Sequence, residues 1–578
     1  MAAKSDRPAT AIDVPPGFWQ REASHYPKPL TPLGASFLLT GINQSFRKVF
    51  EEVGLPIEGL EFREIGGYVY QRMKPLGTGD SAPRKLPPKF VLWLAVRLHP
   101  AFRRRAARCK QVVSGRVDRE YVERWYDEWR PQLVRDIERL RGVDLPAMTD
   151  EQLAAHLDEL WRWGQYCIDV HFLLTIATFP LLNLTFFCRD HLGYDERHVL
   201  VLLAGLSGTS SEPAVVLAKL ADRIRSNDEV TKAVLAADPA AVPSLLVQHS
   251  PDLAAAFHDY IHRYGCRALR YELVEQCLSE RPELVAGLLQ DELRRPNDLE
   301  HEQARLAAAR TEAKAAALAA LATEELRQEF CTLLEEAERA YPIREDNEFY
   351  TISVPLALTR FAVLEAGKRL AANEALADAD DVFLLRFEEL SDVVRSRQAA
   401  YKKFVEQRRE ERAMAEAFDP PAVYGEEPPP PPLDVFPPET RQLMEGLLYV
   451  TEKVFEPELS NRREDSGARE IKGIAAARGT YTGPARIILG EDQFDRLQPG
   501  DVLVCPITSP VWSILFAKIG ALVTDSGGVL SHPAIIAREY GIPAVVATGN
   551  ATQIIADGQR VVVDGEAGVV RLVGDHGL

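Results

Sequence analysis

The chain has 578 residues, a formal net charge of −17 at pH 7, and a composition that is 46% hydrophobic and 26% charged. This length exceeds what one hydrophobic core holds, so we expect several domains of a soluble globular protein. The excess of acidic residues argues against a general role in binding nucleic acids.

The cysteines and the apolar segments predict a cytoplasmic protein. The seven cysteines are dispersed, without a CxxC pair or a Cys/His spacing typical of a metal site. We therefore expect reduced thiols and no metal. The longest apolar stretch, residues 172–187, contains threonine and proline and is short for a membrane span. We interpret it as a buried helix, and we expect neither a membrane nor a nucleic acid as a partner.

The N-terminal region, residues 1–114, is rich in proline and aromatic residues, and we expect it to pack on the domain that follows. Residues 66–70 favour a β-strand, because aromatic and β-branched residues fit the pleated surface of a sheet. We interpret the three consecutive arginines at positions 103–105 as part of a solvated helix face.

Residues 115–417 are predicted to form a helical domain. Apolar residues recur there at spacings of three and four, which is the periodicity of an amphipathic helix. Residues 302–341 are rich in alanine, glutamate and arginine, and they predict either one long amphipathic helix or a helical hairpin.

A proline-rich segment, residues 418–440, comes next. It includes five consecutive prolines, residues 428–432, and such a run favours a semi-rigid polyproline II spacer. We predict that this segment is a hinge linker between the helical domain and the last domain, residues 441–578.

The last domain shows short β-runs that alternate with two helices and are punctuated by glycines, a pattern typical of a small α/β domain. The predicted fold is therefore multidomain, with a mainly α-helical body followed by a small α/β domain.

One loop of this last domain carries the clearest chemical signal. A short apolar strand ends at Thr524, and Gly527 and Gly528 follow, where the backbone can turn tightly. Ser531 is a plausible N-cap residue, so His532 stands at the beginning of a helix. Free backbone N–H groups and the helix dipole favour an anion there. A phosphoryl group carried on the imidazole would be such an anion.

The surrounding residues, GGVLSHPAIIAREYGIPAV, resemble the phosphohistidine loop of the mobile, or swivelling, domain of phosphoenolpyruvate-utilising enzymes. The resemblance extends over roughly the last hundred residues. It implies that His532 is the catalytic residue and carries a phosphoryl group. It also implies that Thr524, Gly527, Gly528 and Ser531 shape the loop.

Three segments of the helical domain resemble other parts of this superfamily, including the central, antibiotic-binding domain of rifampin phosphotransferase. They are residues 264–267 with Glu272, residues 344–347 with Arg360, and residues 379–390. The resemblance implies a substrate-binding domain. It implies these candidates for binding the substrate or the phosphoryl group: Arg267, Glu272, Arg344, Glu345 and Arg360.

The N-terminal motif His25-Tyr26-Pro27-Lys28-Pro29-Leu30 resembles the start of the α subunit of phenylphosphate synthase. A separate ATP-grasp subunit serves that protein. The sequence has no Walker A motif, and no ATP-grasp pattern precedes the helical region. We therefore expect ATP and Mg²⁺ to be bound by a partner similar to the N-terminal part of phosphoenolpyruvate synthase, with no cofactor bound tightly by this chain.

The expected function is that of a phosphotransferase subunit. His532 would accept a phosphoryl group from the ATP-grasp partner and pass it to a hydroxyl of a small phenolic or alcohol substrate. Two alternatives remain open at this point. One is that phosphorylation drives a dehydration or a ligation, and the other is that the chain is a non-catalytic phosphocarrier.

Overall fold

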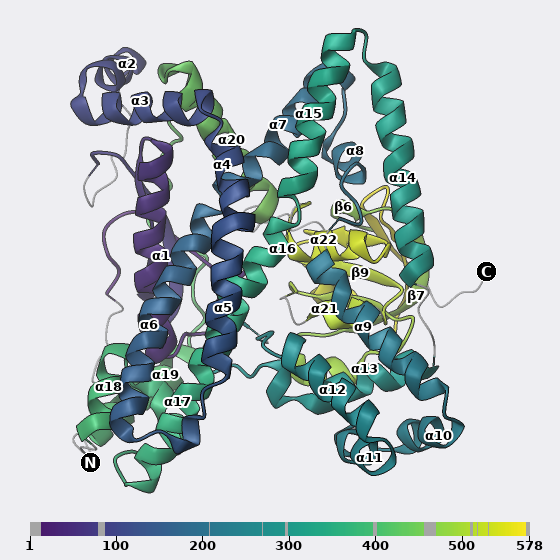
Figure 1. Ribbon diagram of the computed structural model, residues 1–578. Coiled ribbons are helices and arrows are strands. Elements are labelled where there is room, and N and C mark those ends of the chain that lie inside the picture. The colour runs from purple at the N-terminus through teal and green to yellow at the C-terminus, as the bar shows by residue number, and fades with distance from the viewer. Residues whose placement is uncertain are drawn as a thin grey trace, which may run out of the picture.

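The computed structural model shows a mainly helical body and a small C-terminal α/β domain, as the sequence predicts (Figure 1). One half of the body contains the N-terminal helices together with the helices of residues 354–416. The other half packs around the α/β domain, which is coloured yellow in Figure 1. The structure describes residues 13–78, 87–206, 208–268, 270–294, 299–396, 401–455, 470–508, 512–516, 518–529 and 531–573.

The N-terminal region is part of the body rather than a separate unit. Helix α1 (Pro32–Val53) begins after Thr31, whose hydroxyl accepts a hydrogen bond from the Gly34 backbone N–H. Strands β2 (Ile57–Ile65) and β3 (Tyr68–Pro75) then form an antiparallel hairpin. The strand predicted at residues 66–70 begins only at Tyr68, because Gly66 and Gly67 form the turn of this hairpin.

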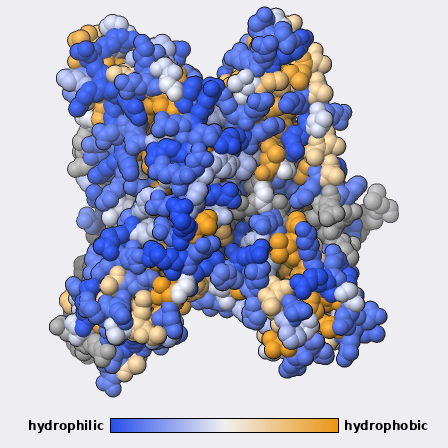
Figure 2. Space-filling model, in the orientation of Figure 1, coloured by the Kyte–Doolittle hydropathy of each residue, from blue (hydrophilic) through white to orange (hydrophobic). Residues whose placement is uncertain are grey.

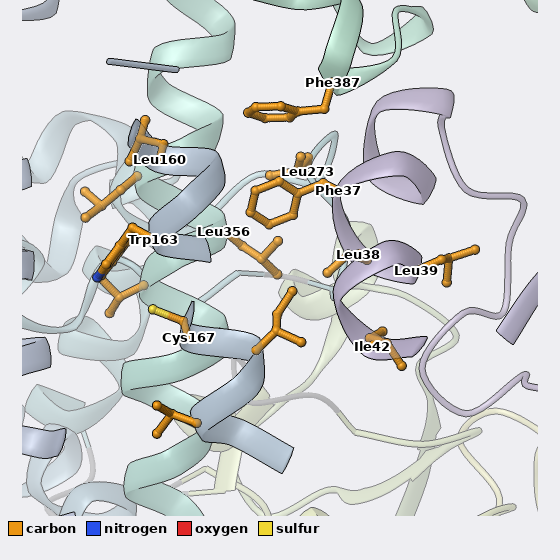
Figure 3. Packing of buried hydrophobic residues seen from close by; sticks show 14 of the residues in the cluster. Phe37, Leu38, Leu39, Ile42, Leu160, Trp163, Cys167, Leu273, Leu356 and Phe387 are labelled. Atoms are coloured by element: carbon orange, nitrogen blue, oxygen red, sulfur yellow. The ribbon is translucent and has the colours of Figure 1, made fainter. Parts of the chain in front are cut away.

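Helix α1 supplies side chains to the largest hydrophobic core. The ring of Phe37 lies 5.7 Å from that of Trp161 on α6 (Asp150–Leu173) and 5.3 Å from that of Phe387 on α18 (Phe387–Ser396), measured between centroids. Figure 3 shows Phe37 pointing from α1 toward these helices, above Leu356 of α17 (Val354–Ala372). Residues far apart in the sequence therefore form one core, in agreement with the expectation that the N-terminal region packs on the helical domain.

Further helices complete the body. Those that surround the core and the α/β domain are α3 (Pro100–Ser114), α4 (Val117–Arg124), α5 (Arg130–Arg141), α7 (Phe179–Leu192), α8 (Glu196–Val201), α9 (Gly208–Arg225), α10 (Asp228–Ala236), α11 (Val242–His249), α12 (Pro251–Tyr264), α13 (Pro282–Arg294), α16 (Ile343–Glu348) and α19 (Lys402–Glu416).

Residues 302–341 form a helical hairpin, the second of the two predicted alternatives. Helices α14 (Leu299–Ala320) and α15 (Glu324–Ala340) meet at the tip of the hairpin and diverge from there toward the body (Figure 1). Two helical stretches, Asp150–Leu192 and Glu324–Ala372, are long and apolar enough to cross a membrane by composition. Most of each apolar window is buried inside the body, as in the core helices of many soluble proteins.

The surface seen in Figure 2 is largely hydrophilic, with scattered apolar areas. Helix α2 (Lys89–Leu98) exposes five large apolar side chains: Phe90, Val91, Trp93, Leu94 and Leu98.

The proline-rich segment, residues 418–440, is predicted to be a hinge linker, and the structure holds its first part against the N-terminal sheet. Its strand β4 (Val423–Tyr424) pairs with β1 (Trp19–Arg21), so it becomes an edge of the N-terminal sheet. The hydroxyl of Tyr70 also donates a hydrogen bond to the carbonyl of Pro421. The sequence pattern could not reveal this pairing, because β1 lies at the opposite end of the chain.

The following helix, α20 (Pro438–Phe455), belongs to the body by its packing. It contacts α3, and Leu443 and Met444 join the largest core. By this packing the α/β domain begins later than the predicted boundary at residue 441. Its first described strand is β5 (Glu470–Lys472).

The α/β domain contains a sheet in the order β5-β12-β11-β7-β8-β9-β10-β6, in which β7, β8, β9 and β10 run parallel and the other neighbours pair antiparallel. The strands are β6 (Ile474–Ala477), β7 (Thr480–Ile487), β8 (Val502–Cys505), β9 (Ala521–Thr524), β10 (Ala544–Val546), β11 (Arg560–Asp564) and β12 (Val569–Leu572), and the helices are α21 (Ser513–Phe516), α22 (His532–Glu539) and α23 (Ala551–Ile554).

The α/β domain is docked on the body through α9, α12 and α13. Phe257 and Leu289 of the body share one buried cluster with Phe516 and Ile536 of the α/β domain. Polar contacts reinforce the docking, since Lys518 Nζ lies 2.7 Å from Asp291 Oδ2. Helix α22 therefore faces the body.

Candidate active site

The glycine-rich loop places His532 at the first position of α22. Ser531 occupies the N-cap position, as predicted, but its hydroxyl donates to the Gly528 carbonyl at 2.7 Å instead of capping the helix. Gly527 has φ +107°, and a Cβ atom there would lie 2.8 Å from Ser531 Oγ. A side chain at Gly527 would therefore disturb the turn that presents His532.

The start of the loop is anchored by side chains. Thr524 ends the buried strand β9, and its hydroxyl donates to the Ser526 carbonyl at 2.7 Å. The carboxylate of Asp525 accepts hydrogen bonds from the backbone N–H and the hydroxyl of Thr552. These bonds fix the loop to α23. Leu530, inside the loop, lies outside the described residues.

His532 meets Glu345 across the boundary between the two domains. Nδ1 of His532 lies 3.3 Å from Oε2 of Glu345, on α16, and both side chains are largely buried. Nε2 of His532 is also buried and has no hydrogen-bond partner within the described residues. Because the contact at Nδ1 sets the orientation of the ring, Nε2 is the nitrogen left available for chemistry.

Arg267 is buried near this contact, and Arg344, next to Glu345 in the chain, is half-buried. The guanidinium of Arg267 lies 4.6 Å from the centre of the Phe349 ring, and it interacts electrostatically with Glu345 and with Tyr540 of the α/β domain. Burial lowers the pKa of Arg267 and of Arg344, and Glu345 opposes the shift in both. The structure thus brings three of the predicted residues, Arg267, Arg344 and Glu345, together with His532.

Arg360 has a different environment. Its guanidinium donates to both carboxylate oxygens of Glu280, at 2.9 and 3.0 Å, and to the carbonyls of Leu273 and Val274. These bonds fasten α17 to the neighbouring loop, which is a structural arrangement. A role of Arg360 in binding the phosphoryl group stays a prediction.

Glu272 is likewise held by structural contacts. Its carboxylate accepts a hydrogen bond from the Thr31 hydroxyl at 2.7 Å, which ties the loop to the beginning of α1. Burial raises the pKa of Glu272 to about 7. Its role in transfer stays a prediction too.

The structure adds a group of residues that the sequence did not single out as site residues. Burial raises the pKa of Glu348 to about 7, while the imidazoles of His532 and His25 lower it. Tyr271 also lowers the pKa of Glu348, and the Tyr271 ring lies 5.3 Å from that of His25. Nδ1 of His25 lies 2.8 Å from a carboxylate oxygen of Glu22.

Weak signals for this group exist in the sequence. Glu348 comes three residues after Glu345, so the two side chains share a helix face. His25 lies in the N-terminal motif. Because it is far from the other site residues along the chain, the sequence does not reveal that it lies near them in the fold. Together these residues provide a nucleophilic imidazole, guanidinium groups that suit phosphoryl oxygens, and a carboxylate that can take up a proton.

Two parts of the chain match the models of known protein families. Residues 497–568, which include His532, match the model of the "PEP-utilising enzyme, mobile domain". Residues 173–345, which include Arg267, Arg344 and Glu345, match the model of the "Rifampicin phosphotransferase fourth domain". Thus His532 and its closest neighbours in the body fall within these matches.

Individual relatives agree with these matches. An "Uncharacterized phosphotransferase YvkC" of Bacillus subtilis is 25% identical over 96% of this chain and 62% of its own length. A "Rifampicin phosphotransferase" of Streptomyces sviceus is 30% identical over 67% of this chain and 42% of its own length. A "Phosphoenolpyruvate synthase" of Pseudomonas aeruginosa is 44% identical over 18% of this chain and 14% of its own length. The chain therefore spans less than two thirds of the length of each of these relatives.

Proposed function

We propose that this chain, which belongs to the superfamily of PEP-utilising enzymes, is a phosphotransferase that carries a phosphoryl group on Nε2 of His532. This proposal is based on the position of His532. Nδ1 is held by Glu345, while Nε2 is buried and has no partner within the described residues, at the contact between the two domains. Relatives named as phosphotransferases support the same reaction class.

The chemistry has two half-reactions. In the first, the neutral imidazole attacks phosphorus of the donor, so that a P–Nε2 bond forms and the leaving oxygen keeps the bonding electrons. In the second, an acceptor hydroxyl attacks the same phosphorus in line and the P–Nε2 bond breaks. Arg267 and Arg344 neutralise the spread negative charge of the migrating group, and positioning supplies most of the remaining rate enhancement.

The docked position of the α/β domain corresponds to the second half-reaction in this scheme, because His532 faces the body. The first half-reaction requires a phosphoryl donor at a different place, so the domain would move between two sites. This movement is part of the proposal and protects the phosphohistidine from water during transfer.

For the acceptor we propose a small phenolic or alcohol hydroxyl. Aromatic side chains lie among the polar groups of the site, namely Phe349 beside Arg267 and Tyr271 beside His25. Such rings favour stacking with an aromatic acceptor. An alternative outcome is that phosphorylation activates the hydroxyl for dehydration or ligation, and in that case inorganic phosphate would be released.

For the donor we propose an ATP-grasp protein that binds ATP and Mg²⁺ and acts on this chain as a partner. The Bacillus subtilis relative extends well beyond the part that matches this chain, which leaves room for a further module in that protein. The exposed apolar face of α2, with Phe90 and Trp93, offers a surface for a protein partner.

Phosphoramidate tests the proposal without the partner, because this reagent phosphorylates histidine directly. After treatment and mapping by mass spectrometry, we expect acid-labile phosphate on His532. The loaded protein is then mixed with a panel of phenols and alcohols, and phosphorus NMR identifies the products. A phosphate ester that forms with the parent protein but not with His532→Ala supports the proposal. Equal ester formation by both proteins, or release of inorganic phosphate alone with every acceptor, contradicts it.

A further inference from the structure

We propose, on the basis of this function, that Glu348 accepts the proton of the acceptor hydroxyl, and that the hydroxyl binds between the Glu348 carboxylate and Nε2 of His532. This assigns a catalytic role to a residue that neither the sequence motifs nor the family matches identify. It also defines the side from which the acceptor approaches, namely the side of His25 and Tyr271.

Helix geometry places Glu348 on the same side of α16 as Glu345, which contacts the imidazole of His532. Glu345 and Glu348 are separated by three residues on α16, so their side chains are neighbours on one face of the helix. Glu345 contacts Nδ1 of His532 at 3.3 Å, and Glu348 interacts electrostatically with the same imidazole. A π-helical turn, Phe349–Ser353, begins directly after Glu348, and such turns often occur at functional sites.

The carboxylate of Glu348 has an unused oxygen. Oε1 is buried and accepts no hydrogen bond from any residue that the structure describes. An unsatisfied buried oxygen is costly, and native proteins seldom keep one without a reason. Nε2 of His532 is unsatisfied in the same way. A single hydroxyl-bearing ligand would account for both unpaired atoms. Its O–H would donate to Oε1 of Glu348, while its oxygen approaches the phosphorus on Nε2 of His532.

The protonation behaviour of Glu348 suits a general base near neutral pH. Its pKa, raised to about 7, means that the carboxylate holds a proton more firmly than an exposed glutamate does, yet is about half ionised near pH 7. Groups from four parts of the chain influence this equilibrium. The titratable or charged groups that interact with Glu348 are His25, Tyr26, Tyr271, Arg344, Glu345 and His532.

Transfer of the phosphoryl group from His532 to the hydroxyl moves one proton and two electron pairs. The hydroxyl proton passes to Oε1 of Glu348, and the electron pair of the O–H bond forms the new O–P bond. The P–Nε2 bond breaks, and its electron pair returns to Nε2. Nδ1 keeps a proton that faces Glu345, so the leaving group is a neutral imidazole rather than an anion. The products are a phosphate ester, a protonated Glu348 and an uncharged His532.

The test compares Glu348→Gln with the parent, each loaded on His532 with phosphoramidate and discharged to a phenol that the parent accepts. Glutamine keeps the shape but cannot take up the proton. We expect normal loading of His532, transfer at least a hundredfold slower, and loss of the rise in rate through about pH 7. The matched control is Asp346→Asn. Asp346 is also buried on α16 but pairs with Arg130, so transfer should stay close to the parent rate.

A second variant, Glu348→Asp, keeps an ionisable group on a shorter arm. We expect slower transfer that still rises with pH, and this variant serves as the test if the glutamine protein does not fold. The proposal fails if a folded Glu348→Gln transfers at the parent rate, or if its pH profile is unchanged. Absence of transfer from the parent protein to every acceptor would instead contradict the proposed function itself.

Discussion

Oε2 of Glu345 lies 3.3 Å from Nδ1 of His532, although the two residues belong to different domains. This contact exists only because the α/β domain is docked on α9, α12 and α13. It links the orientation of the imidazole to the position of the whole domain. Glu345 thereby becomes a positioning residue in the proposed mechanism, since it acts on the substrate through His532.

Replacement of Glu345 should change which nitrogen is phosphorylated. In Glu345→Ala, Nδ1 loses its carboxylate partner, so we expect a mixture of Nδ1 and Nε2 phosphohistidine where the parent gives Nε2 alone. Transfer should slow by roughly tenfold to a hundredfold, the size expected for loss of a hydrogen bond to a charged group. Phosphorus NMR distinguishes the two isomers, and single-turnover discharge measures the rate. A single Nε2 isomer in the variant would show that another group orients the ring.

The ion pair between Lys518 and Asp291 should stabilise the docked state. Their charged atoms are 2.7 Å apart, and the side chains are only 12% and 18% exposed. We expect Lys518→Asp to slow transfer about tenfold, because like charges then face each other at the domain contact. Loading of His532 by phosphoramidate should be unaffected. The double variant Lys518→Asp with Asp291→Lys restores the opposite charges.

Recovery of transfer in this double variant, measured by single-turnover discharge, is the decisive result. If the double variant is as slow as the single one, this ion pair does not hold the docked state. An unchanged rate in the single variant would lead to the same conclusion.

Local sequence patterns predicted much of this architecture. The loop from Thr524 to His532 and the order of helical body and α/β domain follow from residues close together in the chain. The hairpin at residues 302–341 was one of two alternatives that the sequence left open. The position of His532 at a helix start follows from neighbouring glycines and a serine, so it needs no knowledge of distant contacts.

The features that the sequence did not predict depend on contacts between segments that are distant in the chain. The proline-rich segment is predicted to be a hinge linker, because nothing near Val423 reveals that Trp19 pairs with its neighbour Tyr424. Arg360 resembles a phosphate-binding arginine by motif, but its four hydrogen bonds go to Glu280 and to a loop. The sequence did not identify Glu348 as a site residue. Its proposed role depends on its burial and on its position relative to His532, and the residues around it in the sequence reveal neither.

Glu272 should make the stability of the protein depend on pH. Burial raises its pKa from 4.5 to about 7 in the folded protein, so folding favours the protonated form. The folded state is therefore destabilised progressively as pH rises from about 4.5 to about 7. Glu272→Gln removes this dependence, and it should raise the melting temperature relative to the parent more at pH 8 than at pH 5.

Only the difference between the two proteins tests this prediction, because His171 has the opposite influence. Its pKa is lowered to about 4, chiefly by burial, so it destabilises the fold as pH falls below about 6.5. Thermal melts of both proteins across this range are the measurement. A constant difference in melting temperature between pH 5 and pH 8 would contradict the assignment of the raised pKa to Glu272.

Removal of the Arg360 side chain should lower the stability of the protein, whereas removal of the Arg344 side chain should slow phosphoryl transfer. Arg360→Ala leaves Glu280 without its partner and frees two carbonyls, so we expect a loss of about 3 kcal/mol in the free energy of unfolding. Arg344→Ala should fold, load His532 normally, and transfer about a hundredfold more slowly, equal to about 2.7 kcal/mol in the barrier. Denaturant melts and single-turnover discharge at low temperature separate the two effects. If Arg360→Ala is as stable as the parent but transfers slowly, Arg360 belongs to the phosphoryl-binding site, and the family motif would be the better guide than its ion pair with Glu280.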